Sequence, residues 1–263
     1  MSSLIEVSRK IHDKDVAWTE RNLSYTIFHS AYWAQTRVRG AIAAHASVAN
    51  GTLLDVGCGL KPYKDLFLPF IASYIGLEYS PASGYRGNSA DICGDAAELP
   101  IADASIDTIL CTETLSNLPS PETTIREFAR VLKPGGLVIT TAAFVYPLYD
   151  KIDYFRFSRY GIAELIKRSG LEVEKVVPLS GTAVTLSLIF NLYWYDVGFI
   201  WTRWLYPIGL ILRPLLWLGC LVVNLLGGLF EIALPDYRLS FGHLTIARKS
   251  RRNGPKIINP YVF

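Results

Sequence analysis

The stretch LLDVGCGLKPY, residues 53–63, decides how this chain is organised. An apolar run that ends in an acid and passes into alternating glycines is typical of a buried strand leaving a sheet through a tight turn. Gly57 and Gly59 lack the Cβ atoms that would keep a ligand away from the backbone, and they permit dihedral angles closed to other residues. The turn is therefore predicted to hold a ligand, with Asp55 as a fixed acceptor at the end of the strand.

A second run, Ser73–Glu78, also reads as a strand that ends in an acid. It follows the first turn at about the distance, roughly 20 residues, at which open α/β sheets place the carboxylate that holds a ribose diol. A purely structural turn after a core strand would give the same short glycine pattern. The pairing of the two runs favours a nucleoside ligand.

Five motifs follow one another along the chain: Asp-Val-Gly-Cys-Gly at 55–59, Gly-Leu-Glu at 76–78, Gly-Asp at 94–95, Ile-Asp at 106–107 and Leu-Lys-Pro-Gly-Gly at 132–136. In this order they resemble the motifs of class I S-adenosylmethionine-dependent methyltransferases, and most closely those of the methyltransferase type 11 domain. The resemblance runs from about Leu53 to Val177, with a last strand near His243–Lys249. It implies an α/β fold with a Rossmann-like seven-stranded sheet, and S-adenosylmethionine as the cofactor.

The resemblance also assigns roles within the cofactor site. The two glycines would admit the methionine portion, Glu78 the ribose hydroxyls and Asp95 the adenine amine, while a loop acid that caps a helix around 96–99 is the alternative for Asp95. Thr112, Glu113 and Thr114 follow the fourth strand at its carboxyl edge, which faces the methyl donor in this architecture. The predicted cofactor-binding residues are Asp55, Gly57, Gly59, Glu78, Asp95 and Thr112.

The loop at 146–158, YPLYDKIDYFRFS, is unusually aromatic and carries two acids and an arginine where a substrate would lie. Related sequences often show a histidine shortly before a Pro-x-Asp-Tyr-x-Arg run. Here the Asp-Tyr-x-Arg part matches at 153–156, but the proline is missing and Tyr149 stands in place of the histidine. Asp150, Asp153 and Tyr149 are the candidates for a base that takes a proton from the acceptor. No metal site is predicted.

The spacing of apolar residues and the positions of proline and glycine predict the secondary structure. Helices are expected at Thr19–Ala46, Lys61–Phe70, Pro121–Leu132 and Arg159–Ser169. Strands are expected at Asp91–Cys93, Ser105–Cys111, Leu137–Ala142 and Leu171–Val177, besides those already named.

Composition sets limits on the kind of protein. The length of 263 residues suits one sizeable α/β domain with an appendage. Hydrophobic residues make up 51% of the chain and the mean hydropathy is +0.26, so apolar residues beyond those of one core need to be buried. A net charge of +3, without lysine and arginine runs interleaved with aromatics, argues against nucleic acid. The four cysteines lack metal-ligand spacing and are expected to be reduced, and no secretory signal is predicted.

The segment 181–235 is the part that the soluble fold does not require. Each half is near the length that spans a bilayer, about 20 residues, and its tryptophans suit a membrane interface. Asp196 and Arg213 argue against two clean spans, since a charge at mid-bilayer costs roughly 2.5–3.5 kcal/mol. A hairpin or amphipathic pair in one leaflet is therefore favoured over a two-helix span. A buried core helix is the third alternative, but it would need a second core.

The expected topology constrains where this insert leaves the sheet. Strand six runs parallel to the first five and strand seven antiparallel, so the insert leaves and returns on the ligand side. We therefore expect a membrane element beside the active site. The expected domains are 1–50, an N-terminal helical segment; 51–180 with 236–250, the methyltransferase domain; 181–235, a hydrophobic helical insert between strands six and seven; and 251–263, a tail.

Together these features predict a membrane-associated S-adenosylmethionine-dependent methyltransferase at the cytoplasmic face. Its acceptor would be lipid-linked or apolar, such as a glycan or glycolipid hydroxyl, and its partner the lipid bilayer. Methylation of a quinone-like or polyprenyl small molecule is one alternative. A membrane scaffold that has kept the fold without turnover is another, although the intact motif residues count against it.

Overall fold

The computed structural model of the protein describes residues 23–79, 90–148, 152–204 and 208–251, with the side chains of 199–211 excepted. Tyr149 and Asp150, two of the predicted bases, lie outside these ranges. The chain divides into two compact units. One, Val38–Leu179 with Phe241–Phe263, is called the sheet domain below, and the other, Met1–Arg37 with Ser180–Ser240, the helical unit.

The sheet domain contains one seven-stranded sheet in the order β3-β2-β1-β4-β5-β7-β6. Strands β1 to β5 are parallel, whereas β7 lies antiparallel between β5 and β6. This topology confirms the predicted Rossmann-like class I methyltransferase fold. The strands are β1 (Thr52–Val56), β2 (Ser73–Glu78), β3 (Ile92–Cys93), β4 (Ile106–Thr112), β5 (Leu132–Ala143), β6 (Glu172–Pro178) and β7 (Gly242–Arg248).

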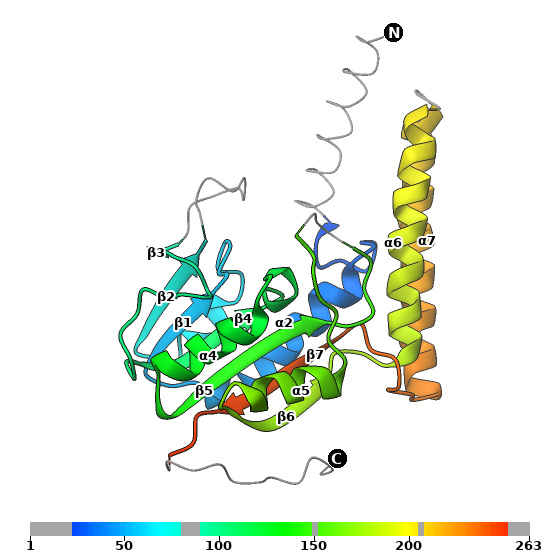
Figure 1. Ribbon diagram of the computed structural model, residues 1–263. Coiled ribbons are helices and arrows are strands. Elements are labelled where there is room, and N and C mark those ends of the chain that lie inside the picture. Colours follow the sequence, from blue (N-terminus) through cyan, green and yellow to red (C-terminus); the bar gives the residue numbers. More distant parts are fainter. Residues whose placement is uncertain (1–22, 80–89, 149–151, 205–207, 252–263) are drawn as a thin grey trace, which may run out of the picture. The chain divides into compact units, whose positions relative to one another are not determined.

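Helices α4 (Pro121–Val131) and α5 (Arg159–Arg168) cover the face of the sheet that is turned to the viewer in Figure 1. Helix α4 begins with a proline, whose missing amide costs nothing at that position. Its apolar face, with Ile125 and Phe128, is fully buried in the core against β4 and β5. Helix α5 is capped by Ser158, whose hydroxyl accepts from the Gly161 amide.

Three predicted helices differ in the structure. Helix α3 covers only Lys64–Phe67 instead of 61–70, because Lys61 adopts a left-handed conformation with φ of 55° and cannot start a right-handed turn. Around residues 96–99 the chain forms a turn closed by a bridge between Asp95 and Glu98, not a helix. The helix predicted at Thr19–Ala46 is also shorter: α2 covers Tyr32–His45, and residues 24–31 form turns in which Tyr25 has a left-handed φ of 63°. The short 3₁₀ turn η1 (Ala46–Val48) follows α2, and a second one, η2 (Leu115–Asn117), follows β4.

The helical unit contains α6 (Thr182–Trp204) and α7 (Ile208–Ala233), which lie side by side in Figure 1. They confirm the helical insert between strands six and seven. Pro178 at the end of β6 pairs with His243, and Ala143 at the end of β5 pairs with Gly242. The chain therefore leaves the sheet domain and returns to it at the edge formed by the carboxyl ends of the parallel strands, as the predicted topology requires.

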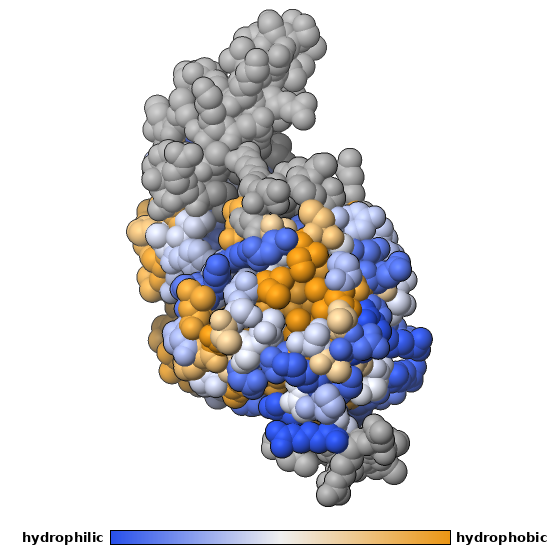
Figure 2. Space-filling view, turned by 90° about the vertical axis from the view of Figure 1, so that its left-hand side faces the viewer, coloured by the Kyte–Doolittle hydropathy of each residue, from blue (hydrophilic) through white to orange (hydrophobic). Residues whose placement is uncertain are grey.

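The side of the sheet domain next to β3 is shown in Figure 2. Hydrophilic residues, in blue, cover much of this side around a group of apolar ones. This mixed surface is ordinary for a protein in contact with water, since apolar atoms contribute more than half of a typical accessible surface.

Candidate functional site

The glycine loop leaves β1 in a conformation that only glycine adopts freely. Gly57 has φ of 73° and Gly59 φ of 48°. The amides of Gly57 and Cys58 both donate to the carbonyl of Leu77, at 2.9 and 3.1 Å. These bonds fasten the loop to the end of β2, so the turn predicted from the sequence stands at the carboxyl ends of two neighbouring strands.

The two glycines have different surroundings. A Cβ on Gly57 would lie 2.2 Å from the Thr114 hydroxyl oxygen, so this glycine is required by close packing. A Cβ on Gly59 would meet nothing within 4 Å. Gly59 therefore presents bare backbone to open space, as a backbone that receives a ligand closely must do.

Glu78 ends β2 and binds the glycine loop directly. Its Oε2 accepts from the Gly59 amide at 3.0 Å, and its Oε1 from the Tyr79 amide at 3.2 Å. A carboxylate offers about four acceptor positions, and these bonds use two. The remaining positions fit the predicted role toward ribose hydroxyls.

Asp55 is buried at the carboxyl end of β1. Its Oδ2 accepts from the phenolic hydroxyl of Tyr74, whereas its Oδ1 has no hydrogen-bond partner among the residues that the structure describes. Burial, opposed by the Tyr74 bond and assisted by the charge of Glu78, raises the pKa of Asp55 to about 7. An unpartnered buried carboxylate oxygen beside the glycine loop fits a polar, cationic ligand, and S-adenosylmethionine carries both an ammonium and a sulfonium charge.

Two residues that sequence reasoning missed hold this loop in place. The Lys61 ammonium bonds to Asp91 Oδ2 at 2.7 Å, and the same oxygen accepts from the Gly76 amide at 2.7 Å. The Lys61 side chain crosses Gly76, since a Cβ there would lie 2.4 Å from Lys61 Cε. The only signal in the sequence was a lysine next to the glycine pattern, and nothing local identified its partner.

The two other predicted cofactor residues lie at the carboxyl ends of β3 and β4, which β2 and β1 separate in the sheet. Asp95 is exposed after β3, and its Oδ1 accepts from the Ala97 amide at 2.8 Å within the turn at 95–98; the helix that it was alternatively predicted to cap is not formed. Thr112 is the last residue of β4, and its carbonyl accepts from the Thr114 hydroxyl at 3.0 Å. Their contacts with a cofactor stay predictions.

Asp153, the one predicted base that the structure describes, is bound to Arg156. Both Asp153 oxygens accept from the guanidinium, and the carboxylate is 4% exposed. Arg156 also donates to the carbonyls of Tyr146 and Pro147, at 3.2 and 2.9 Å. A carboxylate held by a bidentate ion pair is a weak base, so Asp153 has the geometry of a clamp on this loop.

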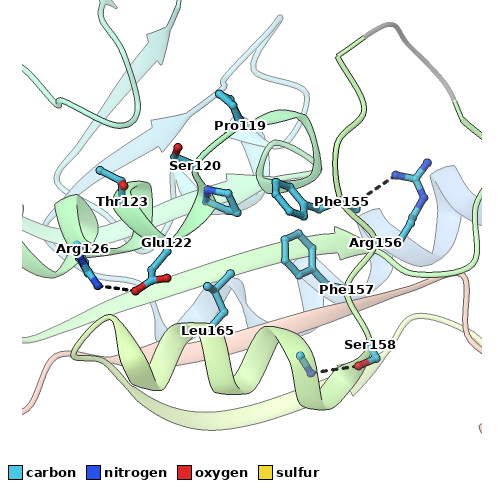
Figure 3. A pocket seen from close by; sticks show the side chains of 12 residues that line it. Pro119, Ser120, Glu122, Thr123, Arg126, Phe155, Arg156, Phe157, Ser158 and Leu165 are labelled. Carbon is cyan, nitrogen blue, oxygen red and sulfur yellow. Dashed lines mark hydrogen bonds and ion pairs between the residues drawn. The ribbon is translucent and has the colours of Figure 1, made fainter.

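The segment after Asp153 runs between η2 and the end of β5. The amides of Tyr154 and Phe155 donate to the Ser116 carbonyl at 2.8 and 3.1 Å. Figure 3 shows the rings of Phe155 and Phe157 side by side, with Arg156 extending away from them. The rings, whose centroids are 5.9 Å apart, line a surface groove of about 600 Å³ at the N-terminal ends of α4 and α5. The segment therefore turns its aromatic residues to α4 and α5 and its arginine to the other side.

The parallel sheet with one antiparallel strand, the glycine loop after β1 and the acid after β2 define a class I S-adenosylmethionine-dependent methyltransferase domain. Comparison with known families agrees, because residues 54–140 match the family described as methyltransferase domain. The chain is 34% identical over 125 residues to the sterol 24-C-methyltransferase of Pneumocystis carinii (strain B80), covering 43% of this chain and 33% of that protein.

Two further relatives extend the comparison. The demethylmenaquinone methyltransferase of Renibacterium salmoninarum is 33% identical over 116 residues, covering 42% of this chain and 48% of that protein. The crystal structure of a putative sarcosine dimethylglycine methyltransferase from Galdieria sulphuraria superposes with a TM-score of 0.52 at 19% identity, covering 84% and 87% of the two chains. This last similarity concerns the fold alone. The chain spans less than half the length of these two curated relatives.

Proposed function

We propose that this protein is a membrane-associated S-adenosylmethionine-dependent methyltransferase that acts at the cytoplasmic face on a lipid-linked or apolar acceptor, such as a glycan or glycolipid hydroxyl. The geometry of the glycine loop supports the assignment of S-adenosylmethionine as the methyl donor. The apolar surface of the helical unit supports the proposed association with a membrane. Both curated relatives carry names that refer to apolar acceptors, a sterol and a menaquinone precursor. A quinone-like or polyprenyl acceptor is therefore the alternative substrate within the same activity.

When bound, S-adenosylmethionine supplies a methyl group on a positively charged sulfur. In the proposed site Gly59 allows the methionine portion to approach the backbone, Glu78 accepts from the ribose hydroxyls, and Asp55 offers a buried acceptor near the positive charge. Holding donor and acceptor in line is the main task of such a protein. The hydrogen bonds from the loop to Leu77 and Glu78 fix these groups before the ligand arrives.

The helical pair is packed as membrane helices are. Gly227 faces Ser187, and Gly219 faces Trp194, so closely that added Cβ atoms would lie 2.1 and 2.8 Å from them. In bilayers, helices associate through small residues that let the backbones approach, and through polar side chains that bond across the interface. Gly219 and Gly227 of α7 therefore pack inside the helical unit.

The polar side chains of the pair also point inward. Asn191 on α6 donates to Asn224 on α7 at 2.9 Å, and Asn224 donates to the carbonyls of Ile27 and His29. Glu231 is buried and accepts from Arg37 at 2.9 Å. The Asn191 and Asn224 amide nitrogens and the Glu231 carboxylate thus have partners within the helical unit, as polar groups at bilayer depth require, whereas the buried Asn191 Oδ1 has none among the described residues.

The outward surface of α7 carries large aliphatic side chains, and this observation supports membrane association most directly. A stripe of six residues is between 47% and 83% exposed. Its members are Leu215, Leu218, Val222, Leu225, Leu229 and Ile232. In water such a surface would be an association or aggregation site, whereas in hydrocarbon it has no cost.

Length and hydropathy agree with this reading. The span Leu212–Ala233 has a mean hydropathy of 2.0 and is only 28% buried, whereas a core helix of the same composition would be mostly buried. At a rise of about 1.5 Å per residue, the 23 and 26 residues of α6 and α7 reach about 34 and 39 Å. Both exceed the hydrocarbon thickness of about 30 Å, so the lengths suit a two-helix span as well as the hairpin in one leaflet that the charges favour.

The topology of the sheet domain makes a direct test of the proposal possible. The Leu179 amide donates to the Gly242 carbonyl at 3.0 Å, so a short glycine-rich turn can replace residues 182–235 without separating β6 from β7. We expect this deletion to release the protein from membranes while calorimetry still detects micromolar S-adenosylmethionine binding. Membrane retention of the shortened protein would refute the anchor, and absence of binding by the full chain would favour a scaffold without turnover.

A further inference from the structure

Glu113 leaves the carboxyl end of β4 in a backbone conformation that is rare for a residue with a side chain. Its φ is 53°. The conformation is held because the Glu113 amide donates to both the carbonyl and the hydroxyl oxygen of Thr141, each at 3.1 Å. Strained residues that are fixed by their surroundings concentrate at functional sites, so Glu113 is a candidate for a functional role.

Glu113 lies between the glycine loop and the segment that follows β5. The next residue, Thr114, packs against Gly57 and donates to the Val56 carbonyl at 3.3 Å, which joins this turn to the glycine loop. On the other side, Thr141 belongs to β5, and Arg156 is near enough for its positive charge to act on the Glu113 carboxyl. The turn is thus flanked by the predicted donor side and by the segment that follows β5.

The surroundings of Glu113 suit a group that exchanges a proton. Partial desolvation by the surrounding turn raises the pKa of Glu113, opposed by the Thr141 hydroxyl and the Arg156 cation. The residue nevertheless remains exposed, so solvent reaches it and limits the rise. Two other ionisable groups among the described residues are less suited to this role, because Asp153 is bound to Arg156 and the Cys111 thiol is fully buried.

We propose that Glu113 accepts the proton of the acceptor's hydroxyl or amine during methyl transfer, an inference that rests on the proposed function. As the acceptor oxygen or nitrogen forms its bond to the methyl carbon, the carbon–sulfur bond breaks with its electron pair remaining on sulfur. The proton released by the acceptor then resides on the Glu113 carboxylate, which becomes a neutral acid. The Thr141 hydroxyl and the positive charge of Arg156 favour the ionised form of the carboxylate before this transfer.

Two substitutions separate this chemistry from the backbone strain. Glu113→Gln keeps the shape and removes the base, whereas Glu113→Gly also removes the strain of the left-handed conformation. Methyl transfer from labelled S-adenosylmethionine into a total lipid extract is measured against pH, together with cofactor affinity by calorimetry and thermal unfolding. Glu164→Gln is the matched control, because Glu164 is an exposed glutamate paired with Arg168 on α5.

We expect both Glu113 variants to lose about 100-fold or more in kcat, the usual contribution of a general base. The affinity for S-adenosylmethionine should stay within about twofold of wild type, Glu113→Gly should melt no lower than wild type, and the control should be unchanged. A Glu113→Gln or Glu113→Gly variant that folds and retains turnover overturns the inference, as does an equal loss of cofactor affinity. If the wild-type chain binds no S-adenosylmethionine, the proposed function fails instead.

Discussion

The hydroxyl of Thr114 occupies the space that a side chain on Gly57 would need. A Cβ on Gly57 would lie 2.2 Å from Thr114 Oγ1, and the φ of 73° disfavours any other residue there. We expect Gly57→Ala to lower the free energy of unfolding by about 1–3 kcal/mol and to weaken S-adenosylmethionine binding, because the loop must move away from β4. Urea denaturation and calorimetry measure the two effects.

A glycine outside the loop supplies the control for this prediction. Gly40 lies in α2, and an added Cβ there would meet nothing within 4 Å. Gly40→Ala should therefore leave cofactor binding unchanged and stabilise the helix by about 0.5–1 kcal/mol. Thr114→Gly should partly rescue Gly57→Ala. Unaltered cofactor affinity in Gly57→Ala would contradict the arrangement of the loop described here.

Asp55 should make the protein less stable as the pH rises from about 4 to 7. Its pKa is raised from 3.8 to about 7 by burial, so the unfolded chain releases this proton at a lower pH than the folded chain. Over that window the unfolded state binds fewer protons, and the free energy of unfolding falls with pH. Asp55→Asn removes the ionisation and keeps an acceptor for Tyr74, so it should flatten the slope and stabilise the protein at pH 8, measured by urea denaturation.

Asp65 provides a control of opposite sign. It is exposed, and its bond to Arg39 lowers the pKa, so its small contribution is present at neutral pH and lost as the pH falls through that pKa. Asp65→Asn should leave the slope between pH 4 and 7 nearly as it is in the wild type. An unchanged slope in Asp55→Asn would show that Asp55 is not the group responsible.

The sequence predicts those parts of the site whose structure is determined by neighbouring residues in the chain. An apolar run before Gly57 and another before Glu78 predict two strands and their turns without knowledge of tertiary partners. The Lys61–Asp91 pair was missed because its partners are 30 residues apart and meet only when β2 and β3 pair. The helix expected at 61–70 was too long for the same reason, since Lys61 is held back over Gly76 by that ion pair.

The acceptor side was harder to predict than the cofactor side. Asp153 looked like a base because the sequence shows an acid in an aromatic loop, but it does not show that Arg156 binds both its oxygens. The spacing of three residues was an available hint, although in a loop it does not determine geometry. Glu113 was noted only for its place at the end of β4, because its left-handed backbone and its contact with Thr141 depend on the neighbouring strand.

Asp153→Asn should loosen the segment after β5 without changing the pH at which activity appears. The substitution leaves Arg156 with a neutral partner in place of a buried carboxylate. We expect this change to lower the free energy of unfolding by about 1–3 kcal/mol. We expect faster hydrogen exchange at the Tyr154 and Phe155 amides, which bond to Ser116, and reduced methyl transfer with an unshifted pH profile. Glu164→Gln, which breaks an exposed ion pair, should cost no more than about 1 kcal/mol. A shifted pH profile in Asp153→Asn would restore Asp153 as a base.

Gly227→Val should open the pair of α6 and α7, because an added Cβ would lie 2.1 Å from the Ser187 hydroxyl oxygen. We expect lower thermal stability of the helical unit in detergent micelles, followed by circular dichroism, while S-adenosylmethionine affinity stays unchanged. Leu226→Val is the control, since Leu226 is exposed on the same helix and its side chain would face lipid. Ser187→Gly in the Gly227→Val background should recover part of the loss, because it vacates the space that the valine needs. Equal melting temperatures for Gly227→Val and Leu226→Val would mean that close packing at this glycine does not hold the two helices together.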